Sequence, residues 1–278
     1  MASPRTLSKE QVQLEAKTVF LTGASSGIGR ALARALARKG CRFVLTARSG
    51  EKLNEVAREI APAESAVMPA DLTESDEVAS LCRRAVERYG SIDIVINCAG
   101  VGIYGASRHV PPDLVRRMFA LNVFAPLEIT RLLLPAMQPG GAFVNISSIV
   151  GKVPLPWLTL YASSKFALNA FSDGLRMELS RAGIHVLCVC PGYVATGFRD
   201  NVLWGRMPAK AAGQRYFGLT AEQCAEAVLD GLRKDKRTVV TPRAGWILVA
   251  LARVVPRFLH GRLARMQEPQ TEYGKRVP

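Results

Sequence analysis

Hydrophobic residues in this 278-residue chain form short, near-continuous apolar runs that alternate with longer segments of helical period. The near-continuous pattern is typical of strands that are buried on both faces, as in a parallel sheet between helices. We therefore expect about seven strands in one sheet. The runs lie at residues 18–21, 42–46, 66–69, 94–97, 142–146, 185–190 and 238–241.

The segments between these runs carry the helical patterns, and Gly40 and Gly90 stand where helix C-caps are expected. Repeated strand–helix–strand units with right-handed crossovers predict an α/β fold. The specific form is a Rossmann-type doubly wound parallel sheet with helices on both faces. The predicted helices cover residues 28–39, 51–60, 75–89, 112–134, 161–181 and 221–233.

The chain contains no linker, short repeat or low-complexity tract, which favours one catalytic domain. We expect this dinucleotide-binding domain at 18–243, with a substrate lid at 197–217 inside it. A polar N-terminal arm at 1–17 precedes it, and a basic amphipathic extension at 244–278 follows it.

The composition is globular, with 49% hydrophobic and 22% charged residues. The six cysteines form no C-x-x-C pair and the three histidines lack ligand spacing, so we expect no metal site. Reduced cysteines favour a reducing compartment. Residues 1–17 have no apolar core of a signal peptide, and the run at 246–252 is too short to span a bilayer. We therefore predict a cytoplasmic protein, with peripheral membrane contact left open.

Charge is concentrated near the C-terminus. The formal net charge is +14, and residues 232–278 hold eleven Lys/Arg against three Asp/Glu. No groove-reading motif accompanies this excess, so we expect no nucleic-acid partner. A basic amphipathic segment here could lie on an anionic membrane. It could instead dock on the body or on a second subunit, which is the interpretation that we favour. Pro256 is expected to break or kink it.

A glycine-rich turn follows the first strand and reads T-G-A-S-S-G-I-G at residues 22–29. Glycines let the backbone turn tightly and approach a phosphate, and the helix that follows presents free N–H groups. Three glycines in this spacing exceed what a simple strand–helix turn needs. The predicted pyrophosphate contacts are Gly23, Ser25, Ser26, Gly27, Ile28 and Gly29.

The end of the second strand indicates which dinucleotide binds. An acid near this point accepts the ribose 2′-hydroxyl in NAD-binding sheets, but the chain has Arg48 there and no acid. A guanidinium suits a 2′-phosphate, so we predict NADP(H) as cofactor. Asp71 and Leu72 follow the third strand and could border the adenine, although Asp71 could equally lead a helix.

Tyr161 and Lys165 are four residues apart, which places them on one face of a helix. A nearby cation favours the phenolate and would lower the tyrosine pKa. Ser148 ends the preceding strand, and Asn122 lies in the helix before it. Alone, the Y-x-x-x-K spacing is more often a half-exposed helix pair, so its context decides.

That context is an ordered set of motifs: T-G-A-S-S-G-I-G, N-C-A-G at 97–100, Asn122, Ser148, Y-A-S-S-K at 161–165 and P-G at 191–192. The set resembles the short-chain dehydrogenase/reductase family in its single-domain form, over about residues 18–241. The end of the second strand is also similar to that of NADP(H)-using members, including the 11β-hydroxysteroid dehydrogenase-like branch.

The resemblance implies roles at matching positions. Tyr161 would be the acid/base, Ser148 would orient the carbonyl, and Lys165 would bind the nicotinamide ribose and depress the tyrosine pKa. Asn122 would anchor a water that relays protons to Lys165. The spacing typical of the family selects Ser148 over its neighbour Ser147. The remaining implied cofactor contacts are Asn97, Ala99, Gly100, Pro191, Gly192, Val194 and Thr196, together with Tyr161 itself.

Substrate choice is expected in the segments outside the sheet, at 101–110, 150–160 and 197–216. Val153, Leu155 and Trp157 indicate an apolar wall, with ordinary packing or an oligomer contact as an equal alternative. We predict carbonyl/alcohol interconversion on an apolar small molecule. The alternatives are a 3-oxoacyl thioester reductase and, in another class, a non-catalytic NADP(H)-binding regulatory protein. The resemblance also implies a homodimer or homotetramer through the helices that carry Asn122 and Tyr161.

Overall fold

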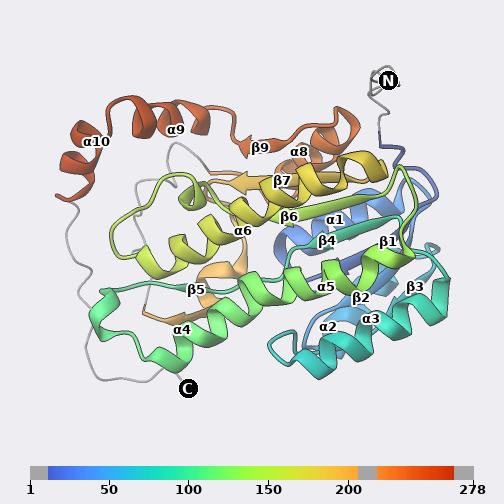
Figure 1. Cartoon of the computed structure of the whole chain (residues 1–278). Helices are drawn as coiled ribbons and strands as arrows, with labels where there is room; N and C mark the ends of the chain where they lie inside the picture. The colour runs from blue at the N-terminus through green and yellow to red at the C-terminus, as the bar shows by residue number, and fades with distance from the viewer. Residues whose placement is uncertain (1–11, 206–217, 266–278) are drawn as a thin grey trace, which may run out of the picture.

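The computed structural model describes residues 12–205 and 218–265, and a seven-stranded parallel sheet runs through its centre (Figure 1). The strand order is β3-β2-β1-β4-β6-β7-β9. The order reverses between β1 and β4, and open α/β sheets bind ligands beyond the carboxyl ends of the strands at such a point. The strands are β1 (Thr18–Thr22), β2 (Arg42–Thr46), β3 (Ser65–Val67), β4 (Ile94–Asn97), β6 (Ala142–Ile146), β7 (His185–Pro191) and β9 (Thr238–Thr241).

The predicted sheet is confirmed, with small changes at strand ends. The run expected at 66–69 begins at Ser65 and ends at Val67. Hydrogen bonds to the β2 side nevertheless continue past Val67, from the Met68 N–H to the Leu45 carbonyl at 3.0 Å and from the Ala70 N–H to the Ala47 carbonyl at 3.2 Å. The segment therefore stays alongside β2 beyond the end of the regular strand.

Helices cover both faces of the sheet, and alternating strand side chains meet them. Val19 and Leu21 pack into one core cluster while Phe20, between them, packs into the other. The first cluster lies under α1 (Gly27–Ala37), α2 (Gly50–Glu59) and α8 (Ala221–Arg233). The second lies under α3 (Ser75–Tyr89), α5 (Ala125–Leu133) and α6 (Thr159–Leu179).

The single helix expected at 112–134 is divided, and this corrects the sequence prediction. It consists of α4 (Pro112–Phe119), the π-helical turn η2 (Ala120–Phe124) and α5, and it ends in the 3-10 turn η3 (Leu134–Ala136). Pro126 explains the break, because it has no N–H for the carbonyl of Asn122 four residues earlier. The wider turn therefore centres on Asn122.

By length and hydropathy the whole run Pro112–Ala136 could cross a membrane, yet 44% of its apolar window is buried. It packs against α3 and α6 in front of the sheet (Figure 1). Its apolar composition is therefore explained by its packing as a core helix.

A second, two-stranded sheet lies beyond the carboxyl ends of the main strands. It pairs β5 (Gly102–Ile103) with β8 (Val202–Trp204), and the Tyr104 N–H donates to the Trp204 carbonyl at 3.0 Å. It joins two of the segments expected to choose the substrate. Residues 206–217 of the predicted lid lie outside the described residues.

The described ends of the chain behave differently from each other. Val12 and Leu14 of the predicted arm are buried in the core. At the other end, α9 (Gly245–Val254) and α10 (Pro256–Leu263) leave the body after β9, and the break expected at Pro256 is confirmed. The division into arm, domain and extension stays a prediction.

Candidate active site

The turn between β1 and α1 is built to bring backbone close to a ligand. Gly23 and Gly27 have positive φ angles of 65° and 51°, which side chains disfavour. A Cβ on Gly29 would overlap the carbonyl oxygen of Gly23. Ser26 caps α1 without a side-chain hydrogen bond, and the first turn holds no acid. The positive helix end is thus left for an anion, and the site fits a pyrophosphate.

Thr22 holds the second cofactor segment against this turn. Its Oγ1 accepts hydrogen bonds from the N–H groups of Cys98 and Ala99 at 2.9 and 3.0 Å. A Cβ on Gly23 would lie 2.8 Å from the Ala99 nitrogen. Thr22 belongs to the quoted motif but carried no predicted role. Asn97, at the end of β4, is tied to Asn145 on β6 at 2.9 Å.

Arg48 is exposed just beyond β2. Burial raises the pKa of Asp71, but hydrogen bonds from Thr73 and, less strongly, the charges of Arg117 and Arg48 leave it lowered. The Asp71 carboxylate accepts from Thr73 N and Oγ1 at 3.0 and 2.8 Å, as a helix-leading turn residue does. Leu72 is buried in the core. Arg48 is therefore the side chain of this group best placed for an incoming phosphate.

The segment after β7 carries the last of the predicted cofactor contacts. Gly192 donates its N–H to the Thr241 carbonyl at 2.7 Å, and Val194 bridges Leu219. A Cβ on Gly27 would lie 3.0 Å from the Thr196 side chain. Thr196 therefore lies beside the glycine turn, although the two are far apart in the sequence.

Ser148 and Tyr161 meet at the carboxyl end of β6. The phenol is buried and hydrogen-bonded to the Ser148 hydroxyl, which also accepts the Val150 N–H at 3.3 Å. Ser147 instead donates to the backbone carbonyl of Lys165 at 3.2 Å. The structure thus places Ser148, and not Ser147, against the tyrosine.

The Tyr161 pKa differs from the sequence expectation. Burial raises it well above its ordinary value of 10.0, and the hydrogen bond to Ser148 offsets only part of this effect. Lys165 Nζ lies 5.8 Å from the centre of the phenol ring and donates to the Ile146 carbonyl at 3.0 Å. Lys165, the expected cause of a lowered tyrosine pKa, is not among the groups that shift it, and desolvation favours the neutral phenol.

Lys165 is itself buried, and burial lowers its pKa from 10.5 to about 8. Asn122 uses its side chain within the protein, exchanging hydrogen bonds of 2.9 Å with Val101 N and O and donating to Ser164 Oγ at 3.1 Å. A Cβ on Gly100 would lie 3.2 Å from Asn122 Oδ1 and 3.4 Å from Lys165 Nζ. The side chains of Asn122 and Lys165 therefore both lie next to Gly100.

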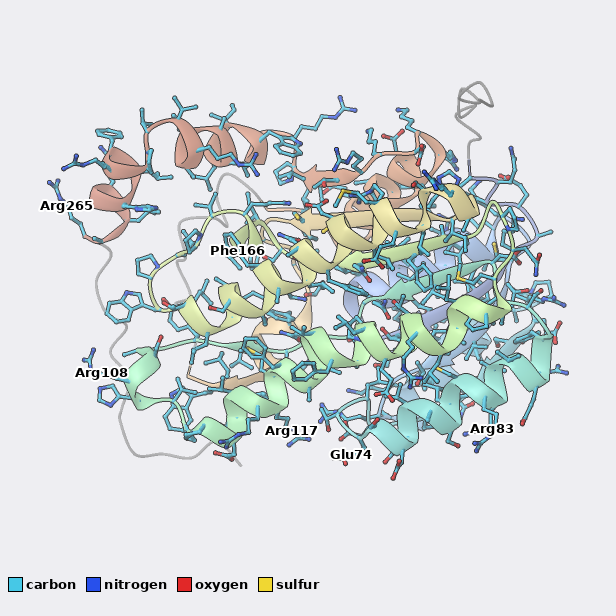
Figure 2. The ribbon with its side chains drawn as sticks, viewed as in Figure 1. Glu74, Arg83, Arg108, Arg117, Phe166 and Arg265 are labelled. Carbon is cyan, nitrogen blue, oxygen red and sulfur yellow. The ribbon has the colours of Figure 1, made fainter. Side chains whose placement is uncertain are left out.

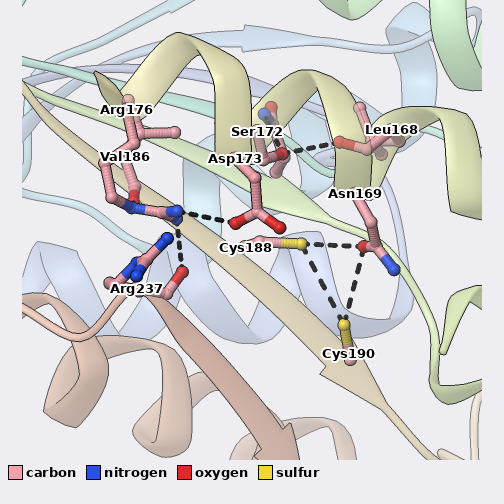
Figure 3. Close-up of polar contacts among 10 residues, drawn as sticks. Leu168, Asn169, Ser172, Asp173, Arg176, Val186, Cys188, Cys190 and Arg237 are labelled. Carbon is pink, nitrogen blue, oxygen red and sulfur yellow. Dashed lines mark hydrogen bonds and ion pairs between the residues drawn. The ribbon is translucent and has the colours of Figure 1, made fainter.

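Behind the tyrosine, α6 is fastened to β7 by polar contacts (Figure 3). Asn169 donates to the Gly151 carbonyl at 2.6 Å, and its Oδ1 accepts from Cys188 Sγ at 2.9 Å. Cys190 lies 4.0 Å from Cys188 between their sulfur atoms. These buried thiols pack the back of the site. No group of three His, Cys, Asp or Glu among residues 12–205 and 218–265 could hold a metal ion.

An apolar cluster surrounds Tyr161 and draws on all three segments expected to choose the substrate. The Phe198 ring centre lies 5.8 Å from that of Tyr161. Leu155 and Trp204 come from two of the segments expected to choose the substrate. The buried members of the cluster are Val101, Ile103, Val110, Met118, Val150, Tyr161 and Ala162.

Comparisons with known proteins agree with this architecture. The family model for short chain dehydrogenases matches residues 17–204. Among curated proteins, the dehydrogenase/reductase SDR family member 7B of Bos taurus is 35% identical over 80% of this chain and 72% of its own length. Ketoacyl reductase HetN of Nostoc sp. is 32% identical over 87% of this chain and 84% of its own.

Solved structures share the fold over most of the chain. A short-chain dehydrogenase from Sphingobium yanoikuyae in complex with NADPH superposes with a TM-score of 0.74 and 27% identity, covering 91% of this chain and 99% of that one. A short chain dehydrogenase from Burkholderia cenocepacia in complex with NADP has a TM-score of 0.73 and 26% identity, covering 83% and 97%.

Proposed function

Since the chain belongs to the short-chain dehydrogenase family, we propose that it interconverts a carbonyl and a secondary alcohol on an apolar substrate, with Tyr161 as acid/base. It is an NADP-dependent oxidoreductase, in line with relatives that bind NADP or NADPH. The observation that carries the proposal is the buried pairing of Ser148 with Tyr161 next to Lys165.

NADPH, when bound, supplies the hydride, and this chain supplies the places that hold its parts. The open N-terminus of α1 and the glycine turn would take the pyrophosphate, and Arg48 would pair with the 2′-phosphate. Lys165 would hydrogen-bond the nicotinamide ribose. The other proposed contacts are Gly23, Ser25, Ser26, Gly27, Ile28, Gly29, Asp71, Leu72, Asn97, Ala99, Gly100, Pro191, Gly192, Val194 and Thr196.

The proton chemistry follows from burial. Tyr161 is held in its neutral form, which is the form that donates a proton to a carbonyl oxygen during reduction. Ser148, already hydrogen-bonded to the phenol, would hold the same oxygen. Lys165 has a pKa of about 8, close enough to neutrality to return a proton toward Tyr161. We propose that Asn122 anchors a water for this relay.

The substrate class follows from the apolar cluster around Tyr161. Its members are aliphatic and aromatic, and apolar surroundings favour a lipophilic carbonyl compound through burial of apolar surface. The likeness to a ketoacyl reductase keeps a 3-oxoacyl thioester as the second candidate. An NADP(H)-binding regulatory protein without turnover is the alternative of another class.

One panel separates these three functions. NADPH absorbance at 340 nm is followed with lipophilic ketones and aldehydes, with a 3-oxoacyl thioester and with no carbonyl. We expect turnover of lipophilic ketones, abolished by Tyr161→Phe and kept by Tyr89→Phe, whose hydroxyl instead donates to the Phe43 carbonyl. Preference for the thioester would move the function to the second candidate. No turnover of any carbonyl would favour the regulatory protein.

We also propose that the chain assembles as a homodimer or homotetramer through the long helices. Phe124, Phe166 and Met177 lie exposed on η2 and α6, and Phe166 projects from α6 in Figure 2. Exposed apolar side chains of this size mark an interaction surface. The six cysteines are all free, which suits the cytoplasmic location that we propose.

A further inference from the structure

Helices α9 and α10 expose apolar side chains that no other part of residues 12–205 and 218–265 covers. Ile247, Leu251 and Val254 follow one face of α9, spaced by four and three residues, and Val254 is 78% exposed. Phe258 on α10 is 67% exposed, and α10 contains no buried residue. The buried side chain of Val249 packs α9 against the protein, so the opposite face of the helix is available to a binding partner.

The charge of the same segment indicates which kind of partner binds this face. Arg253, Arg257, Arg262 and Arg265 accompany the apolar side chains, and the sequence has no acid between Asp235 and Glu268. Figure 2 shows Arg265 at the outer end of α10, away from the body. Two copies paired through these helices would bring arginines together without an acid of the segment to balance them. An anionic surface with an apolar layer beneath it matches both features.

The position of α9 relates this face to the active site. Gly245 at its start is packed so closely that an added Cβ would lie 2.9 Å from Ile149, the residue after Ser148. The preceding strand β9 pairs with β7 up to Pro191, at the carboxyl edge of the sheet. In Figure 1, α9 and α10 extend beyond this edge. They therefore stand on the side of the molecule where Ser148 and the apolar cluster lie.

We propose that α9 and α10 dock on the surface of an anionic lipid bilayer, with Ile247, Leu251, Val254 and Phe258 in the acyl boundary and the arginines among the headgroups. The carboxyl edge of the sheet then faces the membrane, and the apolar substrate is drawn from it. This statement about the substrate rests on the proposed function, whereas docking does not.

Flotation of the full chain with vesicles tests docking. The vesicles are phosphatidylcholine with about 30% phosphatidylserine, or phosphatidylcholine alone. We expect flotation with the anionic vesicles, much weaker binding to neutral ones, and release in about 0.5 M salt, because exposed charges are then screened. Trp246 on α9 should be quenched by brominated lipid, and Trp246→Phe should remove that quenching.

Paired variants identify the surface. Ile247→Ser with Leu251→Ser should weaken partition at least about tenfold, since each loses apolar burial. Met177→Ser removes an exposed apolar side chain from α6, on the proposed oligomer surface, and is the control for apolar loss elsewhere once light scattering shows an unchanged oligomer. Arg257→Gln with Arg262→Gln should weaken binding about 25-fold, at about fivefold for each charge. Arg83→Gln with Arg131→Gln removes two exposed arginines elsewhere and should change it little.

Three outcomes would overturn the proposal: no flotation of the wild type, equal binding by the α9 variants, or tail variants that change only the oligomer measured by light scattering. The last would assign the face to a second copy. Flotation needs no carbonyl turnover, so an inactive protein that still floats refutes the proposed function alone. An active protein that does not float refutes docking alone.

Discussion

Replacing Lys165 by methionine should stabilise the protein while it removes activity. The ammonium is 3% exposed, and burial lowers its pKa from 10.5 to about 8. At about 1.4 kcal/mol for each tenfold change in proton affinity, holding the charge there at pH 7 costs about 3 kcal/mol. Lys165→Met removes this charge but leaves the Ile146 carbonyl without its donor, a loss of about 1 kcal/mol. The free energy of unfolding should therefore rise by about 2 kcal/mol.

The pH dependence of this gain has a definite sign. Because the folded-state pKa of Lys165 is lowered, the unfolded chain binds more protons between about pH 8 and 10.5, and wild-type stability from this group rises across that window. The methionine variant lacks the titration, so its advantage should shrink from pH 7 to about pH 9.5. Urea unfolding of both proteins at both pH values measures it. A less stable variant at pH 7, or an advantage that does not change with pH, would refute the reasoning.

Three further variants test separate parts of the account. Arg48→Ala should weaken NADPH binding about tenfold or more and NADH little, by fluorescence titration; equal losses would contradict its pairing with the 2′-phosphate. Gly29→Ala should abolish NADPH binding because its Cβ overlaps Gly23. Gly174→Ala, with open space around the new Cβ, should bind NADPH normally and raise the free energy of unfolding by up to about 1 kcal/mol. Arg176→Ala should cost about 1–3 kcal/mol of unfolding free energy without changing the KM for NADPH, since its guanidinium pairs with Asp173 and donates to the Val186 and Arg237 carbonyls, away from the cofactor residues (Figure 3); a changed KM would contradict this structural role.

The sheet and the placement of the site could be predicted because their signals are local. Apolar runs mark the strands, and the carboxyl ends of parallel strands meet at one edge. Ser148 and Tyr161 are brought together there although each sequence signal was weak alone. The order of the motifs carried the prediction, because spacing by itself does not distinguish a catalytic Y-x-x-x-K from a surface helix pair.

Features that depend on long-range packing were missed. The π turn at Asn122 follows from Pro126, which the helical period conceals. Thr22 acts through contacts with residues more than seventy positions away. The raised pKa of Tyr161 reflects burial by several elements together, while the spacing to Lys165 indicated only the opposing effect. Propensity and periodicity describe neighbours in sequence, and these three depend on neighbours in space.

The most direct test of the central claim is a single turnover of pre-bound NADPH with the best carbonyl substrate, comparing wild type with Tyr161→Phe. The dissociation constants for NADPH, titrated in the same samples, should agree within about twofold, because the phenol hydroxyl contributes little to NADPH affinity. The decay at 340 nm should be about 10²–10⁴ times slower in the variant, the usual contribution of a positioned acid. Decay at the wild-type rate with NADPH bound would contradict the account.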